Sequence, residues 1–180
     1  VGSLEEVSDR QVARLLEGGG TLLFVAEPEA LLTPAGREAA VAAVAALASR
    51  AVAEGWDLLI RTRADLEAAE AAFRAGRARG LEAGGTRRAI AEGLGRLTAA
   101  AAAAVPLGGL VIVGGDTTAA VYRALGATGT LIEGLRLVRR RRAYDKAMAL
   151  KGKLHLKINV DELRGRPRRV LVFGRRTHRR

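Results

Sequence analysis

Short apolar runs alternate with helical patterns along the first 138 residues, and this alternation constrains the fold more than any other feature. The clearest apolar runs span 21–26, 56–61 and 110–113, and weaker runs at 130–132 and 135–138 suggest a further strand. Apolar residues recur at helical spacing over 34–54, 64–75, 86–104 and the stretch that ends at Leu125. Strands that are joined by helical crossovers form parallel sheets with helices on both faces. We therefore predict a three-layer α/β/α fold with a mostly parallel sheet.

Two helices carry local boundary signals. Thr33 and Pro34 form an N-cap and first-turn pair, and Gly55 ends the helix that they begin. Near the N-terminus, Ser8 is followed by glutamine three residues later, the spacing of a capping box, which predicts a short first helix that starts there. We expect the preceding residues 1–4 to form the end of a strand and a loop.

The composition excludes several classes of site. The chain has no cysteine, so it has no disulfide, no thiolate zinc site and no cysteine nucleophile, and its two histidines offer little to a metal site. Apolar residues make up 49% of the chain, which is enough for a core. No apolar run reaches the roughly 18 residues of a membrane helix, and the N-terminus lacks the order of a signal peptide. We expect a soluble, cytoplasmic protein with no membrane partner.

The net charge of +11 is unevenly distributed. Residues 1–137 carry 14 arginines against 16 acidic residues, a net charge of −2, whereas residues 138–180 carry 12 arginines and 4 lysines against 3 acidic residues, a net charge of +13. We therefore predict two parts, an α/β domain over 1–138 and a basic C-terminal appendage over 139–180. Because the chain starts at Val1 and its sole methionine is Met148, we also expect it to be cut from a longer polypeptide.

Three interpretations of the segment 139–180 stay open. Its arginines suit sequence-independent, salt-sensitive binding of nucleic acid, but it offers few aromatic side chains for base stacking. The segment is otherwise a solvated basic appendage or the product of a shifted reading frame, and we favour these two together over nucleic-acid binding. Apolar residues at 154–160 and 170–173 suggest a short two-stranded ribbon within it.

The turn after the run 110–113 is the first candidate for a ligand site. In an open parallel sheet, ligands bind beyond the carboxyl ends of the strands. Two glycines let the backbone approach a ligand there, and Asp116 or Thr117 is expected to cap the following helix, whose amide groups suit a phosphate. The threonine hydroxyls suit phosphate oxygens, and Asp116 suits a magnesium ion, held directly or through water. An ordinary tight turn with a capped helix explains the same pattern.

Familiar phosphate-binding motifs are absent. No GxxxxGK[ST] occurs, and the first lysine is Lys146, so arginine, magnesium and backbone amides must neutralise any phosphate that the α/β domain binds. Gly93 and Gly95 imitate the start of a dinucleotide-binding fingerprint. They lie inside a helical pattern with no strand before them, and we therefore reject that interpretation.

Several segments, taken in order, resemble a known family. Gly2 and Ser3, the helix SDRQVARLLE, the later run LVIVGGDTTAAVYRALG and a final strand are similar to the C-terminal, nucleotide-binding domain of the four-carbon acid sugar kinases. The resemblance covers roughly residues 1–138, and GGDT followed by a helix ending in RALG is its most specific part. It implies a kinase of carbohydrate metabolism that uses ATP and Mg²⁺ to phosphorylate a hydroxyl of a sugar acid such as a tetronate.

The resemblance also implies site residues. It places Ser3 at the nucleotide-contacting serine of the first loop, and it places Gly114, Gly115, Asp116 and Thr117 at the phosphate-facing loop. It implies that a preceding domain, missing from this chain, binds the sugar acid, and it assigns no catalytic residue here.

One part of the family pattern is missing. Family members close the nucleotide site with a glycine-rich segment resembling KSGNFG, whereas Lys151 and Gly152 are followed here by Lys153 and Leu154. Two alternatives to an active kinase domain therefore stay open: a nucleic-acid-binding protein that acts through its basic segment, and an inactive fragment that lacks its sugar-acid domain.

Overall fold

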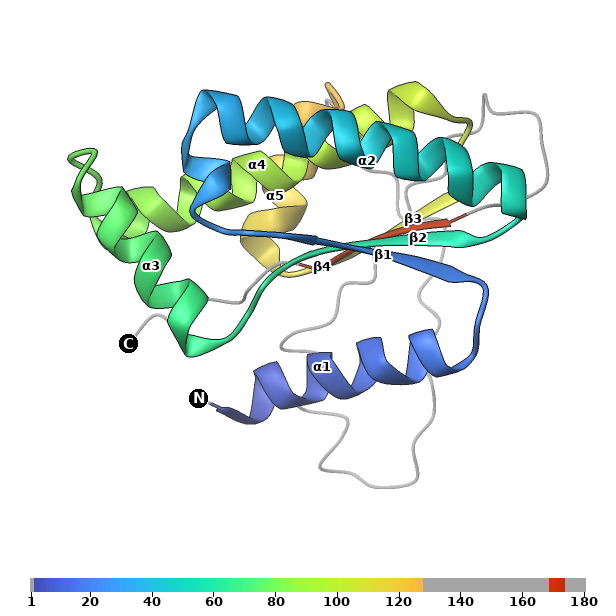
Figure 1. The fold of residues 1–180 in the computed structure, drawn as a ribbon, viewed down its shortest axis with the longest axis horizontal. Helices are drawn as coiled ribbons and strands as arrows, with labels where there is room; N and C mark the ends of the chain where they lie inside the picture. The colour runs from blue at the N-terminus through green and yellow to red at the C-terminus, as the bar shows by residue number, and fades with distance from the viewer. Residues whose placement is uncertain (1, 128–168, 174–180) are drawn as a thin grey trace.

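The computed structural model describes residues 2–127 and 169–173, and it arranges them as helices around a small sheet (Figure 1). In chain order the elements are α1 (Gly2–Glu17), β1 (Thr21–Ala26), the 3-10 helix η1 (Ala30–Leu32), α2 (Pro34–Glu54), β2 (Asp57–Thr62), α3 (Leu66–Arg77), α4 (Ala83–Ala104), β3 (Gly109–Val113), α5 (Gly115–Ala124) and β4 (Arg169–Phe173).

The strands form one parallel sheet between two helical layers. Their order is β1-β2-β4-β3, and every neighbouring pair is parallel. Helices α2, α4 and α5 cover one face, and α1 covers the other (Figure 1). This arrangement confirms the predicted three-layer α/β/α fold. In the part of the chain that the structure describes, no helix combines the length and the apolarity that a membrane crossing requires.

The alternating sides of β2 face the two helical layers. Leu58 and Ile60 belong to the main core, which also contains Val44 of α2. Leu59, between them, packs against Val12 of α1 on the opposite face. Because successive side chains of a strand point to opposite faces, a strand that is covered on both sides must be apolar throughout. The apolar run of β2 therefore marks a doubly covered strand, whereas in β1 Leu23 and Val25 are 38% and 43% exposed, so a continuous apolar run there does not mean that both faces are covered.

Helix α2 begins and ends where its local signals predict. The Thr33 hydroxyl accepts a hydrogen bond of 3.0 Å from the N–H of Gly36, and Pro34 occupies the first helical position. At the other end, Gly55 has a φ of 75°, the left-handed conformation that glycine adopts without strain.

Helix α1 begins earlier than predicted. It spans Gly2–Glu17, so the strand end and loop expected over 1–4 are wrong for residues 2–4, and Ser8 does not mark the start of the helix. The capping-box spacing is a local pattern that also occurs inside helices, and here the helical backbone continues from Ser8 back to Gly2.

Two glycines inside α4 allow neighbouring elements to approach closely. A Cβ added at Gly93 would lie 2.9 Å from the Cβ of Leu31, and one at Gly95 would lie 2.7 Å from the carbonyl oxygen of Ala120 in α5. Both glycines lie within a continuous helix, which confirms that they do not form a dinucleotide fingerprint. Close packing against η1 and α5 offsets the low helix propensity of glycine at these positions.

The strand β4 comes from the basic C-terminal segment. It pairs in parallel with β2 at 4 residue positions and with β3 at 5. Five residues of the segment predicted as an appendage thus contribute a strand to the sheet of the α/β domain. The other strand of the expected ribbon, 154–160, and the further strand expected at 130–132 and 135–138 lie outside the described residues.

Candidate functional site

The turn from β3 to α5 lies at the carboxyl end of the sheet. Gly114 forms this turn with a φ of 108° and a ψ of 131°, a combination that side chains make sterically unfavourable. The chain passes from strand to helix within this one residue, so α5 starts directly beyond the end of β3. The predicted order of strand, glycine turn and helix is confirmed, at the position where open parallel sheets bind ligands.

The first turn of α5 presents backbone N–H groups. Its N-cap is Gly114, so the prediction that Asp116 or Thr117 caps this helix is wrong. The N–H of Thr118 donates to the carbonyl of Gly114 at 2.9 Å. The N–H groups of Gly115, Asp116 and Thr117 precede it. Together with the positive end of the helix dipole, these three groups favour an anion such as a phosphate.

The side chains of this turn differ in exposure. Asp116 is exposed, whereas Thr117 is only 1% exposed. The Thr118 hydroxyl donates to the carbonyl of Gly114 at 2.8 Å, so this hydroxyl is engaged within the helix. Gly115 is exposed, and a Cβ added there would have no described atom within 4 Å apart from its adjoining residues and the local helix backbone. A ligand at this turn would therefore meet the backbone of Gly115 with no side chain in between.

The donor set at this turn fits Mg²⁺ better than it fits a metal held by protein ligands only. Mg²⁺ retains several waters, and it usually binds one or two carboxylates together with phosphate oxygens of the substrate. Asp116 supplies one exposed carboxylate in the first turn of α5. Among residues 9–127, whose side chains are described, no three His, Cys, Asp or Glu side chains form a group that could hold a metal.

Ser3 lies apart from this turn. It belongs to the first turn of α1, which starts at the end of the molecule toward which the strands run (Figure 1). However, α1 covers the face of the sheet opposite to α5. The structure thus places the two predicted parts of the site at the same end of the sheet but on opposite faces.

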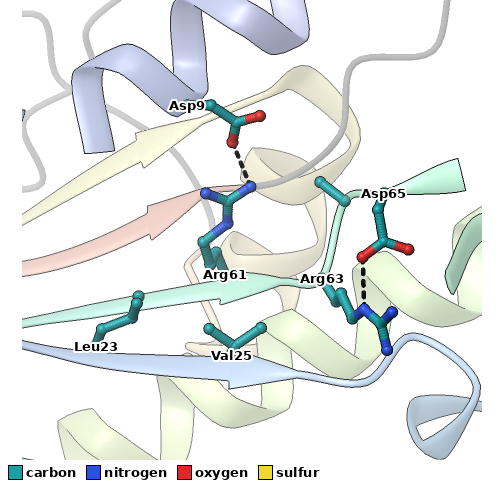
Figure 2. Close-up of a pocket in the computed structure, with 7 residues that line it drawn as sticks. Asp9, Leu23, Val25, Arg61, Arg63 and Asp65 are labelled. Carbon is teal, nitrogen blue, oxygen red and sulfur yellow. Dashed lines mark hydrogen bonds and ion pairs between the residues drawn. The ribbon is translucent and has the colours of Figure 1, made fainter. Parts of the chain in front are cut away.

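A shallow cavity lies at the carboxyl ends of β1 and β2, on the face that α1 covers (Figure 2). It is lined by Asp9, Leu23, Val25, Arg61, Arg63, Ala64 and Asp65. Arg61, near the end of β2, donates to the carboxylate of Asp9 at 2.6 Å and so connects α1 to the sheet.

Arg63 forms a network with three carboxylates. It donates to Asp65 at 2.5 Å and to Glu67 at 3.0 Å, and it lies 3.8 Å from Glu27. The N–H of Ala68 and, next, the Arg63 guanidinium lower the pKa of Asp65 by hydrogen bonding to its carboxylate. At this cavity two arginines are thus matched by four acidic side chains, so the local charge does not favour an anion.

Sequence reasoning did not single out Arg61 and Arg63. A signal was present, because both follow the apolar core of the predicted strand 56–61, at the end where open sheets bind ligands. The sequence did not show that acidic side chains neutralise the charge of these arginines, since Asp9, the partner of Arg61, is 52 positions away along the chain. These arginines therefore connect elements of the fold, and the turn at Gly114 remains the better candidate for a phosphate.

Comparison with protein families identifies the family of the α/β domain. The family model described as the nucleotide-binding C-terminal domain matches residues 1–137 of the 180-residue chain. The chain belongs to this family. It is the nucleotide-binding domain found in the four-carbon acid sugar kinases, as the GGDT motif and its neighbouring elements implied. No curated protein and no solved structure matches the chain. The family match ends one residue before the predicted boundary at 138 and does not include β4.

Proposed function

We propose that the domain binds ATP with Mg²⁺ at the turn between β3 and α5, and that it serves the transfer of a phosphoryl group to a hydroxyl of a four-carbon sugar acid. The observation that carries this proposal is the family membership over 1–137, combined with a Gly114 turn that presents helix amides beyond the carboxyl end of the sheet. A cytoplasmic location is part of the proposal, because ATP-dependent sugar metabolism takes place there.

In this proposal the backbone of the turn stabilises negative charge. The N–H groups of Gly115, Asp116 and Thr117 donate to phosphate oxygens, and these hydrogen bonds strengthen as charge develops during transfer. The Asp116 carboxylate holds Mg²⁺ directly or through water, and the bound ion neutralises part of the phosphate charge. The bond between the γ-phosphorus and the oxygen that bridges it to ADP breaks, and a bond to the oxygen of the acceptor hydroxyl forms. The sugar acid and the base that takes its proton are assigned to a separate sugar-acid domain.

Nucleotide binding is tested by thermal unfolding of the chain with ATP or ADP and Mg²⁺. A ligand at 100 times its Kd stabilises the folded state by about 2.7 kcal/mol. For a chain of this size, that stabilisation raises the Tm by roughly 5–11 °C. We expect a smaller rise without Mg²⁺, because Asp116 and the phosphates then repel each other. No rise with nucleotide at millimolar concentration would refute the proposal.

Two matched variants locate the site. Gly115→Val adds a side chain where, among the described residues, no atom outside the local helix backbone and the adjoining residues lies within 4 Å of the new Cβ, so it should obstruct a phosphate with little effect on the unliganded fold. Gly84→Val makes the same change at an equally open position in the first turn of α4. We expect Gly115→Val to abolish the nucleotide-dependent rise in Tm and Gly84→Val to retain it. Equal rises in the two variants would place the nucleotide elsewhere.

Two further variants test the hydroxyls that the family resemblance assigns to the site. Thr117→Val and Ser3→Ala each remove one hydroxyl, and we expect each to reduce the nucleotide-dependent rise in Tm. Retention of the full rise in Ser3→Ala would restrict the nucleotide to the face of the sheet that carries α5.

Phosphoryl transfer is tested on a polypeptide that joins this domain to a sugar-acid domain. The expected result is release of ADP that depends on a tetronate, and its loss in Gly115→Val but not in Gly84→Val. Nucleotide binding without ADP release would instead support an inactive domain. Binding to any duplex that decreases by orders of magnitude between about 50 and 200 mM salt would support the nucleic-acid alternative.

A further inference from the structure

The strand β4 ends beside the turn at Gly114. It lies between β2 and β3 (Figure 1), and in its parallel pairing with β3 the last residues of the two strands, Val113 and Phe173, are opposite each other. Neighbouring strands of a sheet are about 4.8 Å apart. Because the two strands are parallel, the chain that follows Phe173 leaves the sheet at the same end as the chain that follows Val113. The carboxyl end of β4 and the N-terminus of α5 are therefore neighbours.

The sequence that follows β4 is strongly basic. It continues from Phe173 as GRRTHRR, and its first two arginines are Arg175 and Arg176. A chain extends by at most about 3.6 Å for each residue, so the Cα of Arg175 must lie within about 7 Å of the Cα of Phe173 in any backbone conformation. The long arginine side chain extends this reach further. Covalent geometry therefore keeps two guanidinium groups within reach of a phosphate that is bound at the turn.

A nucleotide at this turn requires more positive charge than the α/β domain supplies. Residues 1–137 contain no lysine, and their 16 acidic residues outnumber their 14 arginines. Arg61 and Arg63 are matched by acidic side chains, and they line the cavity on the face that α1 covers (Figure 2). Mg²⁺ neutralises only part of the phosphate charge. Guanidinium groups suit the remainder, because they keep their charge and donate two parallel hydrogen bonds to phosphate oxygens.

We propose that Arg175 and Arg176 bind the phosphate groups of ATP at the Gly114 turn, so that the end of the basic segment completes the nucleotide site. This inference rests on the proposed function, because it names the cations of that same site. The amide groups of α5 and the two guanidinium groups approach the phosphates from the ends of adjacent strands, β3 and β4. The segment 139–180 consequently contributes both a strand of the sheet and a part of the ligand site.

The affinity for ATP with Mg²⁺, measured by isothermal titration calorimetry, tests the proposal. Loss of one charge-assisted hydrogen bond weakens binding by about 10- to 100-fold. We therefore expect Arg175→Gln combined with Arg176→Gln to raise the Kd by at least about tenfold. Replacement of both by lysine keeps the charge and should raise the Kd less. Arg10→Gln combined with Arg14→Gln is the matched control, because it removes the same charge from exposed positions of α1, which covers the opposite face of the sheet from α5.

A shortened chain provides a second test. A chain that ends at residue 174 retains β4, so it should unfold at the Tm of the full chain, but it should bind ATP as weakly as the variant with both glutamines. If the unaltered chain binds no ATP, the proposed function is refuted, and this inference with it. If the unaltered chain binds ATP and the glutamine variant binds it equally well, or the control weakens binding to the same extent, this inference alone is overturned.

Discussion

Replacement of Gly95 by alanine tests the packing that positions the candidate site. The added Cβ would lie 2.7 Å from the carbonyl oxygen of Ala120 and 2.9 Å from its carbonyl carbon, distances that side-chain Cβ atoms essentially never show. Both atoms belong to the backbone of α5, so no side-chain rotation relieves the overlap. We expect α5 to move away from α4 by about half an ångström, a form of overpacking.

Two opposing effects set the size of the expected change. Alanine has a higher helix propensity than glycine, which contributes about 1 kcal/mol of stability in a helix interior. Overpacking against a fixed backbone costs about 1–3 kcal/mol, and here the upper part of that range applies, because two backbone atoms are overlapped. We therefore expect a net loss of about 1–2 kcal/mol, which lowers the Tm by roughly 2–8 °C for a chain of this size.

Gly84→Ala provides the control within the same helix. A Cβ added at Gly84 has no atom within 4 Å, so only the gain in helix propensity remains, and the Tm should stay the same or rise. Thermal unfolding followed by circular dichroism compares the two variants directly. A Tm for Gly95→Ala that equals or exceeds that of Gly84→Ala would refute the close approach of α4 and α5. Because α5 carries the turn at Gly114, Gly95→Ala should also reduce the rise in Tm that ATP and Mg²⁺ produce.

Three further predictions address the cap of α2, the loss of stability at acidic pH and the role of β4. Thr33→Ala removes the hydrogen bond to Gly36 and should lower the free energy of unfolding by about 1 kcal/mol in urea, whereas Thr33→Ser should retain most of it. The hydrogen bonds to the Asp65 carboxylate lower its pKa in the folded state below the value of 3.8 in the unfolded state. The ionised carboxylate therefore stabilises the folded protein above pH 3.8, and this contribution is lost as the pH falls through the pKa of the folded state. Thermal melts should therefore show Asp65→Asn less stable than the parent near neutral pH, with the two converging below about pH 4; a constant difference would contradict this reasoning. A chain that ends at residue 138 lacks β4, which pairs with β2 at 4 residue positions and with β3 at 5. If each lost hydrogen bond contributes about 1 kcal/mol, their sum approaches the whole free energy of unfolding of a domain, so the shortened chain should lose its cooperative thermal transition. A chain that ends at 174 should keep the melt, and equal melts for the two lengths would show that β4 is dispensable.

Local patterns predicted most elements of this fold. The continuous apolar runs marked β1, β2 and β3. In β2 the run reflects two covered faces, whereas β1 is apolar although Leu23 and Val25 leave one of its faces exposed. Thr33, Pro34 and Gly55 marked the ends of α2, because capping depends on residues that are adjacent in sequence. The same local reasoning failed at α1, where the capping-box spacing at Ser8 lies inside a helix that begins at Gly2.

The candidate site was only partly predictable. The GGDT motif located the turn at Gly114, because a glycine pair between a strand and a helix is a local signal. The direction of the threonine hydroxyls was not predictable, since Thr118 bonds back to Gly114 and Thr117 is buried by packing. The separation of Ser3 from that turn depends on which face of the sheet α1 covers, and no residue near Ser3 specifies this.

The sequence by itself therefore determined the type and the approximate limits of most elements, the family and the turn most suited to a phosphate. The tertiary structure decided the strand order, the insertion of β4 between β2 and β3, the approach of Gly95 to Ala120 and the pairing of Arg61 with Asp9. The physical reason is the range of the interactions. Caps, turns and periodicity act between residues a few positions apart, whereas strand pairing and close packing join segments that are distant in the chain and of similar composition.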